Sequence, residues 1–293
     1  MGNKVCVFGA GGQLGSDLLL RSELFSIEVH GYDAGSCDIT DENQVERVVS
    51  GFRFDAIVNS AAYTQVDRAE HDRENAWRVN TLGAENIARA CEKMGIPLIH
   101  VSTDYVFDGT AGNPYGEGAA VCPESVYGST KAEGESKVLE VCRVASVVRT
   151  SWLFGENGPN FVKTMVRLAR EREELKVVND QRGCPTWSRD LADALLSMVK
   201  TMLGGGPIPK GVYHYCGMPE ASWYELARYS IDEASKFQKL TIHNLMPIPT
   251  KEYPTPAKRP LYSVLSCDRI VEEFGVEQGD WRRGVREVIK SGA

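Results

Sequence analysis

The stretch VCVFGAGGQLG, residues 5–15, decides the fold of this chain. Lys4–Phe8 is a short apolar run typical of a buried strand, and Gly9, Gly12 and Gly15 follow it in the pattern G-x-x-G-x-x-G. The first glycine allows a tight turn, the second lets the backbone approach a pyrophosphate, and the third lets a helix pack closely on the sheet. The N-terminus of that helix offers free N–H groups to phosphates. The stretch therefore predicts a strand, a turn and a helix that together bind a dinucleotide.

Apolar strands and helices alternate outward from this turn through residue 150. Strands are expected at Ile27–Tyr32, Ala56–Asn59, Leu98–Val101 and Ala145–Arg149, and helices at Gln13–Leu20, Asp41–Gly51, Asp72–Met94 and Val126–Glu140. Strands that are apolar throughout and alternate with helices indicate a parallel sheet covered on both faces. The fold class is therefore α/β, with a doubly wound parallel sheet of the Rossmann type, in which ligands bind beyond the carboxyl ends of the strands.

The second half of the chain is less regular. Helices are expected at Phe161–Glu171, Arg189–Met202, Trp223–Ala234 and Trp281–Lys290, and strands at Leu175–Val178 and Val212–Tyr215. Met246–Pro260 contains five prolines, so we expect it to be extended and irregular. We predict that residues 1–150 plus roughly 183–215 form an NAD(P)-binding Rossmann domain. Residues 151–182 plus 216–293 would form a smaller, discontinuous C-terminal α/β domain that binds the substrate.

Composition excludes several classes of protein. The hydrophobic fraction of 42% and the charged fraction of 25% exclude a mostly disordered chain and a coiled coil. The net charge of −7 makes nucleic acid a poor partner. No apolar run approaches the roughly 18 residues of a membrane span, so no membrane partner is expected. None of the eight cysteines forms a C-x-x-C pair, and we expect reduced thiols in a cytoplasmic protein.

Asp33 follows Gly15 by eighteen residues and lies at the end of the second expected strand. A carboxylate at this place accepts hydrogen bonds from the adenosine ribose hydroxyls. It would favour NAD over NADP, because it repels a 2′-phosphate. The alternative is a solvated loop acid. Because one side chain can swing aside, both NADH and NADPH stay open as cofactors.

Tyr127 and Lys131 are four residues apart on an expected helix and therefore share one face. A nearby ammonium favours a phenolate, so Lys131 should lower the pKa of Tyr127 and make it a usable general acid. Thr103 follows the fourth expected strand, and its hydroxyl could bond both a substrate oxygen and Tyr127. The alternatives are a strand-end cap for Thr103 and an Asx turn for Asp104. Their place at a carboxyl strand end favours the functional interpretation.

Several short segments, in this order, carry a resemblance to a known family. They are GxxGQLG (9–15), NSAAYT (59–64), STDYVFDG (102–109), VYGSTK (126–131), RTSW (149–152), NFVKTM (160–165), NDQxGxPT (179–186) and YPTPAxRP (253–260). Together they span nearly the whole chain and resemble the dTDP-4-dehydrorhamnose reductases, a family of extended short-chain dehydrogenases/reductases.

The resemblance implies a specific reaction. It is the NADH- or NADPH-dependent reduction of the 4-keto group of dTDP-4-dehydro-β-L-rhamnose to dTDP-L-rhamnose, a step in nucleotide-sugar biosynthesis for cell-surface polysaccharide. Tyr127 would protonate the new alkoxide, Lys131 would hold the cofactor ribose, and Thr103 would tune Tyr127 and bind the sugar. A dTDP-sugar is thus the expected partner, and the resemblance leaves a homodimer possible.

The family pattern also implies two sets of binding residues. The cofactor set is Gly9, Gly12, Gln13, Leu14, Gly15, Asp33, Asp38, Ile39, Ala61, Ala62, Tyr63, Thr64 and Lys131. The substrate set is Thr103, Asp104, Tyr127, Trp152 and Arg259. Trp152 could instead be a core residue, and Arg259 a surface residue, with Lys163 and Arg182 as rivals for the diphosphate. Asn80 resembles the helix asparagine that supports the Tyr/Lys pair, although burial alone could explain it.

Departures from the family pattern leave alternatives open. Arg189 stands where some members have an acid that binds Mg²⁺ at a dimer contact, so no metal is expected. Tyr63 stands where His is also seen. A dehydratase or epimerase needs an Asp–Glu pair after the threonine, but Asp104 is followed by Tyr105. A ketoreductase for another dTDP-deoxysugar stays open, as does a non-catalytic regulatory subunit, although such a subunit would usually have lost the tyrosine or the lysine.

Overall fold

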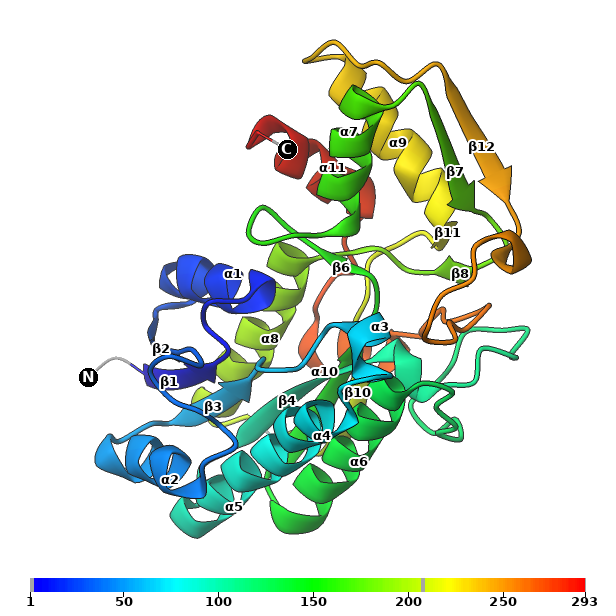
Figure 1. Ribbon diagram of the computed structural model, residues 1–293. Helices are drawn as coiled ribbons and strands as arrows, with labels where there is room; N and C mark the ends of the chain where they lie inside the picture. Colours follow the sequence, from blue (N-terminus) through cyan, green and yellow to red (C-terminus); the bar gives the residue numbers. More distant parts are fainter. Residues whose placement is uncertain (1–2, 207–208, 293) are drawn as a thin grey trace.

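Six parallel strands form the central sheet of the computed structural model, which describes residues 3–206 and 209–292. The strands lie in the order β10-β5-β4-β3-β1-β2, and every neighbouring pair is parallel (Figure 1). Their bounds are β1 Asn3–Phe8, β2 Ile27–Tyr32, β3 Ala56–Asn59, β4 Leu98–Thr103, β5 Ala145–Thr150 and β10 Gly211–His214. The order reverses beside β1, which is the topology of a doubly wound sheet, so the predicted fold class is confirmed.

Helices cover both faces of this sheet. In Figure 1, α1 (Gln13–Arg21) and α8 (Ser188–Leu203) lie on one face, and α2 (Glu42–Gly51), α5 (Ala84–Met94) and α6 (Val126–Val141) lie on the other. Side chains of β1 alternate between two hydrophobic clusters. Val5 and Val7 join the cluster under α1 and α8, whereas Cys6 and Phe8 join the one under the other three helices. This alternation explains why the strand is apolar throughout.

The helix expected at Asp72–Met94 is a succession of three segments. These are α4 (Arg73–Trp77), a wider π-helical segment at Arg78–Gly83, and α5, which ends at Gly95 in the left-handed conformation with φ +68°. The prediction of one regular helix was wrong in its middle, where the π-helical segment holds the buried Asn80. Such segments occur frequently at functional sites.

The smaller part of the molecule contains α7 (Phe161–Glu171), α9 (Trp223–Ser235) and α11 (Trp281–Lys290), which share a hydrophobic cluster. Beside them, β7 (Glu174–Val178) pairs in parallel with β12 (Asn244–Ile248) (Figure 1). Met246–Pro260 was expected to be irregular, but its first residues belong to β12. A proline is tolerated there because β12 is an edge strand of a two-stranded sheet.

Several short elements complete the fold. Helix α10 (Asp268–Phe274) packs near β10 and was not predicted, and α3 (Val66–Ala69) follows β3. The short strands are β6 (Leu153–Phe154), β8 (Arg182–Gly183), β9 (Thr186–Trp187) and β11 (Ala221–Ser222), and the 3₁₀ turns are Ser22–Phe25, Asp104–Val106 and Thr250–Glu252. The chain leaves the sheet after β5 and returns to it through α8 and β10. The domain boundaries given above stay a prediction. Within the described residues, no helix combines the length and the apolar character that crossing a membrane requires.

Candidate active site

The glycine-rich turn joins β1 to α1 at the carboxyl edge of the sheet. Gly9 has φ +84°, and a Cβ atom there would lie 2.5 Å from the backbone nitrogen of Ala61. A Cβ atom on Gly15 would lie 2.2 Å from the carbonyl oxygen of Gly9. Gly12 is the N-cap of α1 and gives it no side-chain cap. The turn is therefore tight because it lacks side chains, and the N-terminus of α1 is open to an anionic group.

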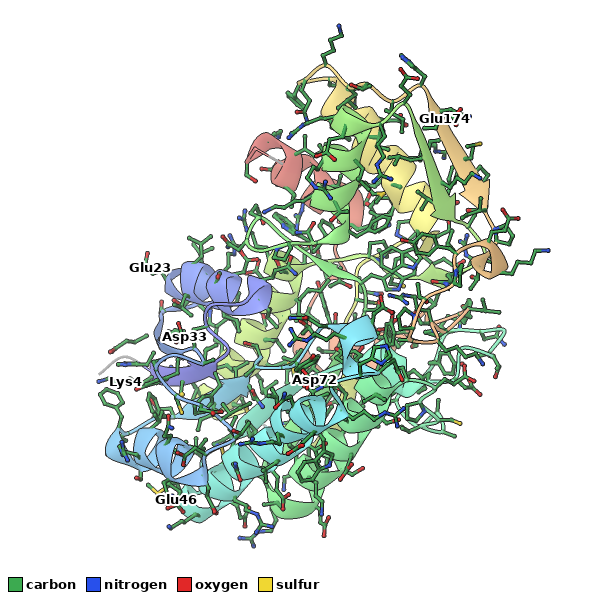
Figure 2. All side chains as sticks on the ribbon, in the orientation of Figure 1. Lys4, Glu23, Asp33, Glu46, Asp72 and Glu174 are labelled. Carbon is green, nitrogen blue, oxygen red and sulfur yellow. The ribbon has the colours of Figure 1, made fainter. Side chains whose placement is uncertain are left out.

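Asp33 lies directly after β2, beside this turn (Figure 2). Its Oδ1 atom accepts hydrogen bonds from the backbone N–H of Gly35 at 3.0 Å, and from both the N–H and the hydroxyl of Ser36 at 3.0 Å. These bonds, with the Ser36 hydroxyl first, lower the pKa of the exposed carboxyl group. A Cβ atom on Gly11 would lie 3.6 Å from Asp33 Cβ. The carboxylate is thus ionised, fixed by its own loop and adjacent to the turn.

The other residues predicted to hold the dinucleotide differ in what they expose. The side chains of Leu14 and Ile39 are buried in the two hydrophobic clusters, so only their backbones can contact a ligand. Asp38 is exposed, and its Oδ1 atom accepts a hydrogen bond from Thr40 N at 2.9 Å. Gln13 accepts a hydrogen bond from Asn160 at 3.1 Å, which links the turn to the N-terminus of α7.

The loop after β3 holds Ala61, Ala62, Tyr63 and Thr64, and Asn80 connects it to α6. The side-chain oxygen of Asn80 accepts from Tyr63 N at 2.8 Å, and its amide nitrogen donates to Tyr63 O at 3.2 Å and to Thr130 Oγ1 at 3.0 Å. Asn80 therefore ties this loop to the helix that carries the Tyr/Lys pair. The Tyr63 hydroxyl donates to Asp72 at 2.9 Å.

Thr103, Asp104 and Tyr127 lie together beyond the end of β4. The Thr103 hydroxyl donates to Asp104 Oδ1 at 3.1 Å and accepts from Tyr105 N at 3.2 Å. Burial raises the pKa of Asp104 to about 6, although Ser263 and Thr103 act against it. Burial also raises the pKa of Tyr127 to about 12, with the Thr103 hydroxyl lowering it and the charge of Asp104 raising it further. Tyr127 is therefore a protonated phenol at neutral pH, the form that can donate a proton.

Lys131 does not lower the pKa of Tyr127 in this structure, contrary to expectation. Its Nζ atom donates to the carbonyl oxygen of Val101 at 2.7 Å and lies 3.4 Å from Nε2 of His100. Burial lowers the pKa of Lys131 itself to about 8, with Glu135 acting in the opposite direction. The Nζ group is directed to β4, and Lys131 is not among the groups that set the pKa of Tyr127.

Two buried residues beneath Lys131 were not predicted from the sequence. His100 is fully buried in β4, and its Nδ1 atom lies 3.0 Å from the amide nitrogen of Asn59 at the end of β3. The sequence does contain a sign of this buried pair, because His100 is a polar residue within the otherwise apolar run Leu98–Val101. A polar residue in a buried strand needs a partner, and that partner could be named only from the fold.

Trp152 lies just beyond β5, whose last residue, Thr150, pairs in register with Thr103. Its φ is +46°, a strained conformation for a bulky residue, and its ring stacks on Trp223 with centroids 3.6 Å apart and planes 9° apart. A Cβ atom on Gly183 would lie 2.5 Å from the Trp152 ring. The ring is half-buried, so it is neither a pure core residue nor a free surface residue.

Each cation proposed for a diphosphate already has partners. Arg259 donates two hydrogen bonds to the Asp67 carboxylate, at 2.9 and 2.8 Å. Lys163 binds the carbonyl oxygens of Glu156 and Gly158, and Arg182 pairs with Glu220 at 2.7 Å and Glu225 at 3.2 Å. Arg259 is the one beside the Tyr105–Tyr127 pair: its charge acts on Tyr105, whose ring lies 5.5 Å from that of Tyr127.

Arg189 forms ion pairs with Glu156 at 2.6 Å and with Asp17 at 3.7 Å. Across residues 3–206 and 209–292, no group of three or more His, Cys, Asp or Glu side chains is arranged to hold a metal ion.

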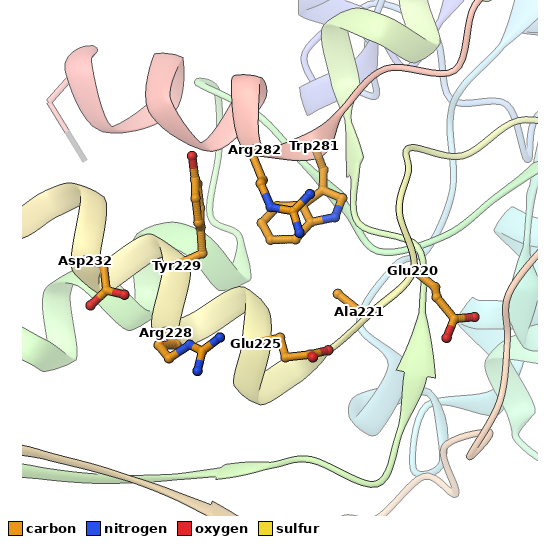
Figure 3. A pocket seen from close by; sticks show the side chains of 8 residues that line it. All are labelled: Glu220, Ala221, Glu225, Arg228, Tyr229, Asp232, Trp281 and Arg282. Carbon is orange, nitrogen blue, oxygen red and sulfur yellow. The ribbon is translucent and has the colours of Figure 1, made fainter.

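A cavity of about 300 Å³ between α9 and α11, shown in Figure 3, is lined by none of the residues predicted for the site. Its lining residues are Glu220, Ala221, Glu225, Arg228, Tyr229, Asp232, Trp281 and Arg282.

Comparison with known proteins shows which family the chain belongs to. The family model for the RmlD substrate binding domain matches residues 3–293. The chain is 40% identical over 287 residues to a dTDP-4-dehydrorhamnose reductase of Aggregatibacter actinomycetemcomitans, covering 97% of this chain and 98% of that protein. It is 39% identical over 290 residues to the dTDP-4-dehydrorhamnose reductase of Escherichia coli strain K12, covering 97% and 96%.

A solved structure extends the comparison to three dimensions. The crystal structure of dTDP-4-dehydrorhamnose reductase from Bacillus anthracis, in complex with NADP, superposes with a TM-score of 0.90 at 36% identity and covers 99% of both chains. Sequence and structure thus agree over essentially the full length, and the chain belongs to the dTDP-4-dehydrorhamnose reductase family.

Proposed function

We propose that this protein reduces the 4-keto group of dTDP-4-dehydro-β-L-rhamnose to dTDP-L-rhamnose with NADH or NADPH. The observation that carries the proposal is the contact of Tyr127 with Thr103 at the carboxyl edge of the sheet, with Lys131 one turn further along α6 and a tight glycine turn after the first strand. The names of the relatives support the same reaction.

The residues present fit a dinucleotide. The glycine turn leaves room at Gly9 and Gly15, where a Cβ atom would collide with backbone, and α1 begins without a side-chain cap. Gln13 and Leu14 would bind the phosphates through their backbone N–H groups, beside Gly12, whose own N–H donates to the oxygen of Gly9 at 3.0 Å. Asp33 and Lys131 would bind the two riboses. The reduced nicotinamide supplies a hydride when it is bound.

Tyr127 would act as the proton donor to the sugar oxygen. It keeps its proton at neutral pH because partial burial and the nearby Asp104 raise the pKa of the phenol. Thr103 would bind the same oxygen and orient the phenol, since its hydroxyl already links Asp104 to the backbone of Tyr105. A positioned acid of this kind typically contributes about 10²–10⁴-fold to a rate.

The substrate would lie between this triad and the smaller part of the molecule. Trp152, held against Trp223, would border the sugar. Arg259 would meet the diphosphate by exchanging its bidentate contact with Asp67 for one with phosphate oxygens, which have a similar geometry. A homodimer and a cytoplasmic location stay predictions.

Two alternatives are less well supported. A dehydratase lacks its second acid/base residue, because Tyr105 follows Asp104. A ketoreductase for another dTDP-deoxysugar would use the same triad, so only the substrate distinguishes it.

The experiment is to supply enzymatically generated dTDP-4-dehydro-L-rhamnose and follow NADH and NADPH oxidation by absorbance, with product identification by mass spectrometry and NMR. Oxidation coupled to dTDP-L-rhamnose formation is the expected result. A protein that binds NADPH but leaves this sugar unreduced would contradict the proposal.

A further inference from the structure

Lys131 is a buried lysine whose Nζ atom has no carboxylate of its own as a partner. It is 1% exposed, and its Nζ atom has the carbonyl oxygen of Val101 at 2.7 Å and the ring nitrogen Nε2 of His100 at 3.4 Å. The carboxylate one turn further along α6, Glu135, is engaged by Arg149 of β5 through bonds of 2.9 and 2.6 Å. Tyr127, one turn earlier, is a neutral phenol. The groups around Nζ therefore offer little compensation for a positive charge.

The orientation of the Asn59 amide determines the tautomer of His100. Oδ1 of Asn59 accepts a hydrogen bond from Ala61 N at 3.1 Å, which directs the amide nitrogen toward His100 Nδ1 at 3.0 Å. An amide NH₂ group only donates, so Nδ1 must be the acceptor. Burial lowers the pKa of His100 well below its ordinary value, and the ring is neutral. A neutral imidazole carries one N–H group, which is therefore on Nε2.

In this tautomer the Nε2–H donor of His100 faces Lys131 Nζ. An ammonium group has three N–H donors and no acceptor, so a charged Lys131 would face the Nε2–H group of His100 donor to donor. A neutral amine has a lone pair, which accepts from Nε2–H while one amine N–H donates to Val101 O. Hydrogen bonding along Asn59, His100 and Lys131 is therefore complete only when Lys131 is neutral.

We propose that Asn59 and His100 are positioning residues that favour the neutral amine form of Lys131 in the cofactor-free protein, so that dinucleotide binding is accompanied by uptake of one proton at Lys131 Nζ. The inference rests on the proposed function, in which Lys131 binds the cofactor ribose. The proton comes from solvent and adds to the amine lone pair, giving the ammonium. Ribose oxygens accept hydrogen bonds and the pyrophosphate is negative, so a bound dinucleotide favours the charged form.

The electrostatic environment of Lys131 also disfavours its charged form. Burial lowers the pKa of Lys131 to about 8, so the lysine titrates close to physiological pH. If binding restores an ordinary pKa of about 10.4 to Lys131, uptake should approach about 0.75 proton per cofactor near pH 8.5 and fall to almost zero near pH 6.5. A Lys131 that is already charged before the cofactor binds would give no such dependence on pH.

The test is calorimetric titration of NADPH into the whole protein near pH 8.5, in buffers of different ionisation enthalpy. The slope of the observed enthalpy against buffer enthalpy gives the number of protons taken up. The 2′-phosphate of NADPH is fully ionised at this pH, since its second pKa is about 6, and adds nothing. We expect proton uptake for the wild type and its loss in Lys131→Met, with Lys93→Met, an exposed lysine on α5, as the control.

Asn59→Asp tests the tautomer argument directly. A carboxylate oxygen in place of the amide nitrogen accepts from Nδ1–H, which moves the imidazole proton to Nδ1 and makes Nε2 an acceptor for the ammonium. Lys131 should then be charged before binding, and uptake should fall to near zero. No uptake by the wild type, or undiminished uptake by Lys131→Met, would overturn the inference even if Asn59→Asp failed to fold. Absence of NADPH binding would contradict the proposed function and this inference together, whereas binding without uptake would contradict this inference alone.

Discussion

Replacing Gly15 by alanine would place a methyl group inside the turn between β1 and α1. Its Cβ atom would lie 2.2 Å from the oxygen of Gly9, 2.6 Å from Cα of Ala10 and 2.8 Å from the carbonyl carbon of Gly9. All three are backbone atoms, and carbon contacts are comfortable only beyond about 3.5 Å. The turn must therefore move by about 1 Å to accept the methyl group.

Two opposing effects determine how much the Gly15→Ala substitution changes the free energy of unfolding. Alanine is about 1 kcal/mol more favourable than glycine inside a helix. Overpacking costs about 1–3 kcal/mol, and here the collision is with backbone, so the upper half of that range applies. A net loss of about 1–2 kcal/mol should lower Tm by about 2–8 °C. Displacing one N–H group from a phosphate, worth about 1.5–3 kcal/mol, should weaken NADPH binding by about 10- to 200-fold.

Thermal unfolding and calorimetric titration with NADPH measure both effects. Gly51→Ala is the matched control, because Gly51 is the last residue of α2 and a Cβ atom there has nothing within 4 Å. We expect the control to keep the wild-type Kd and a Tm that is unchanged or slightly raised. A Gly15→Ala variant with wild-type Tm and Kd would refute the account of the turn.

Three further variants address the cofactor, the sugar and the effect of pH. Asp33→Ser should shift the affinity ratio toward NADPH by about two- to fivefold, because an exposed carboxylate repels the 2′-phosphate only weakly through solvent; titration with both dinucleotides measures this. Trp223→Leu removes the ring stacked on Trp152 and should raise KM for the sugar by about two- to tenfold with a smaller effect on kcat, as steady-state kinetics would reveal. Burial lowers the pKa of His214 to about 3 from 6.5, so the unfolded chain binds more protons, and this contribution to stability is present above pH 6.5 and is lost as the pH falls toward 3. Urea unfolding should therefore show that His214→Gln loses about 2 kcal/mol less stability than the wild type between about pH 7 and pH 5.

The outcomes that would contradict these expectations are equally specific. An unchanged affinity ratio in Asp33→Ser would leave that carboxylate with a role only in its own loop. A Trp223→Leu variant whose kcat fell with KM unchanged would place the indole pair outside sugar binding. Equal acid sensitivity of His214→Gln and the wild type would remove His214 as a cause, and the exposed His71, replaced by Gln, is the control for it.

The sheet could be predicted from the sequence because its signals are local. Ile27–Tyr32 and Ala56–Asn59 are strands with the predicted bounds, and Asp41 caps α2 as expected by accepting from Asn43 N and Gln44 N. Each of these depends on a few neighbouring residues: apolar runs, a capping side chain and glycine stops. The alternation of such elements is enough to specify a parallel sheet and its carboxyl edge.

The parts that were missed depend on contacts between residues far apart in the chain. The π-helical segment lies where α6 packs so closely that a Cβ atom on Gly134 would lie 2.2 Å from the oxygen of Asn80. Arg259 meets Asp67 across 192 positions, and no local pattern predicts that pair. The direction of the Lys131 side chain depends on His100, which sits on a different element. Sequence patterns predict candidate reactive residues, but the partners of these residues are determined by tertiary packing.

The central claim is that Tyr127 delivers the proton in this reduction, and Tyr127→Phe tests it most directly. The variant removes one oxygen atom from a half-buried ring and should fold and bind NADPH like the wild type. The measurement is the rate of dTDP-L-rhamnose formation by wild type and variant at saturating NADPH. We predict a loss of about 10²–10⁴-fold with an unchanged Kd for NADPH. A variant that formed product at close to the wild-type rate would contradict the account.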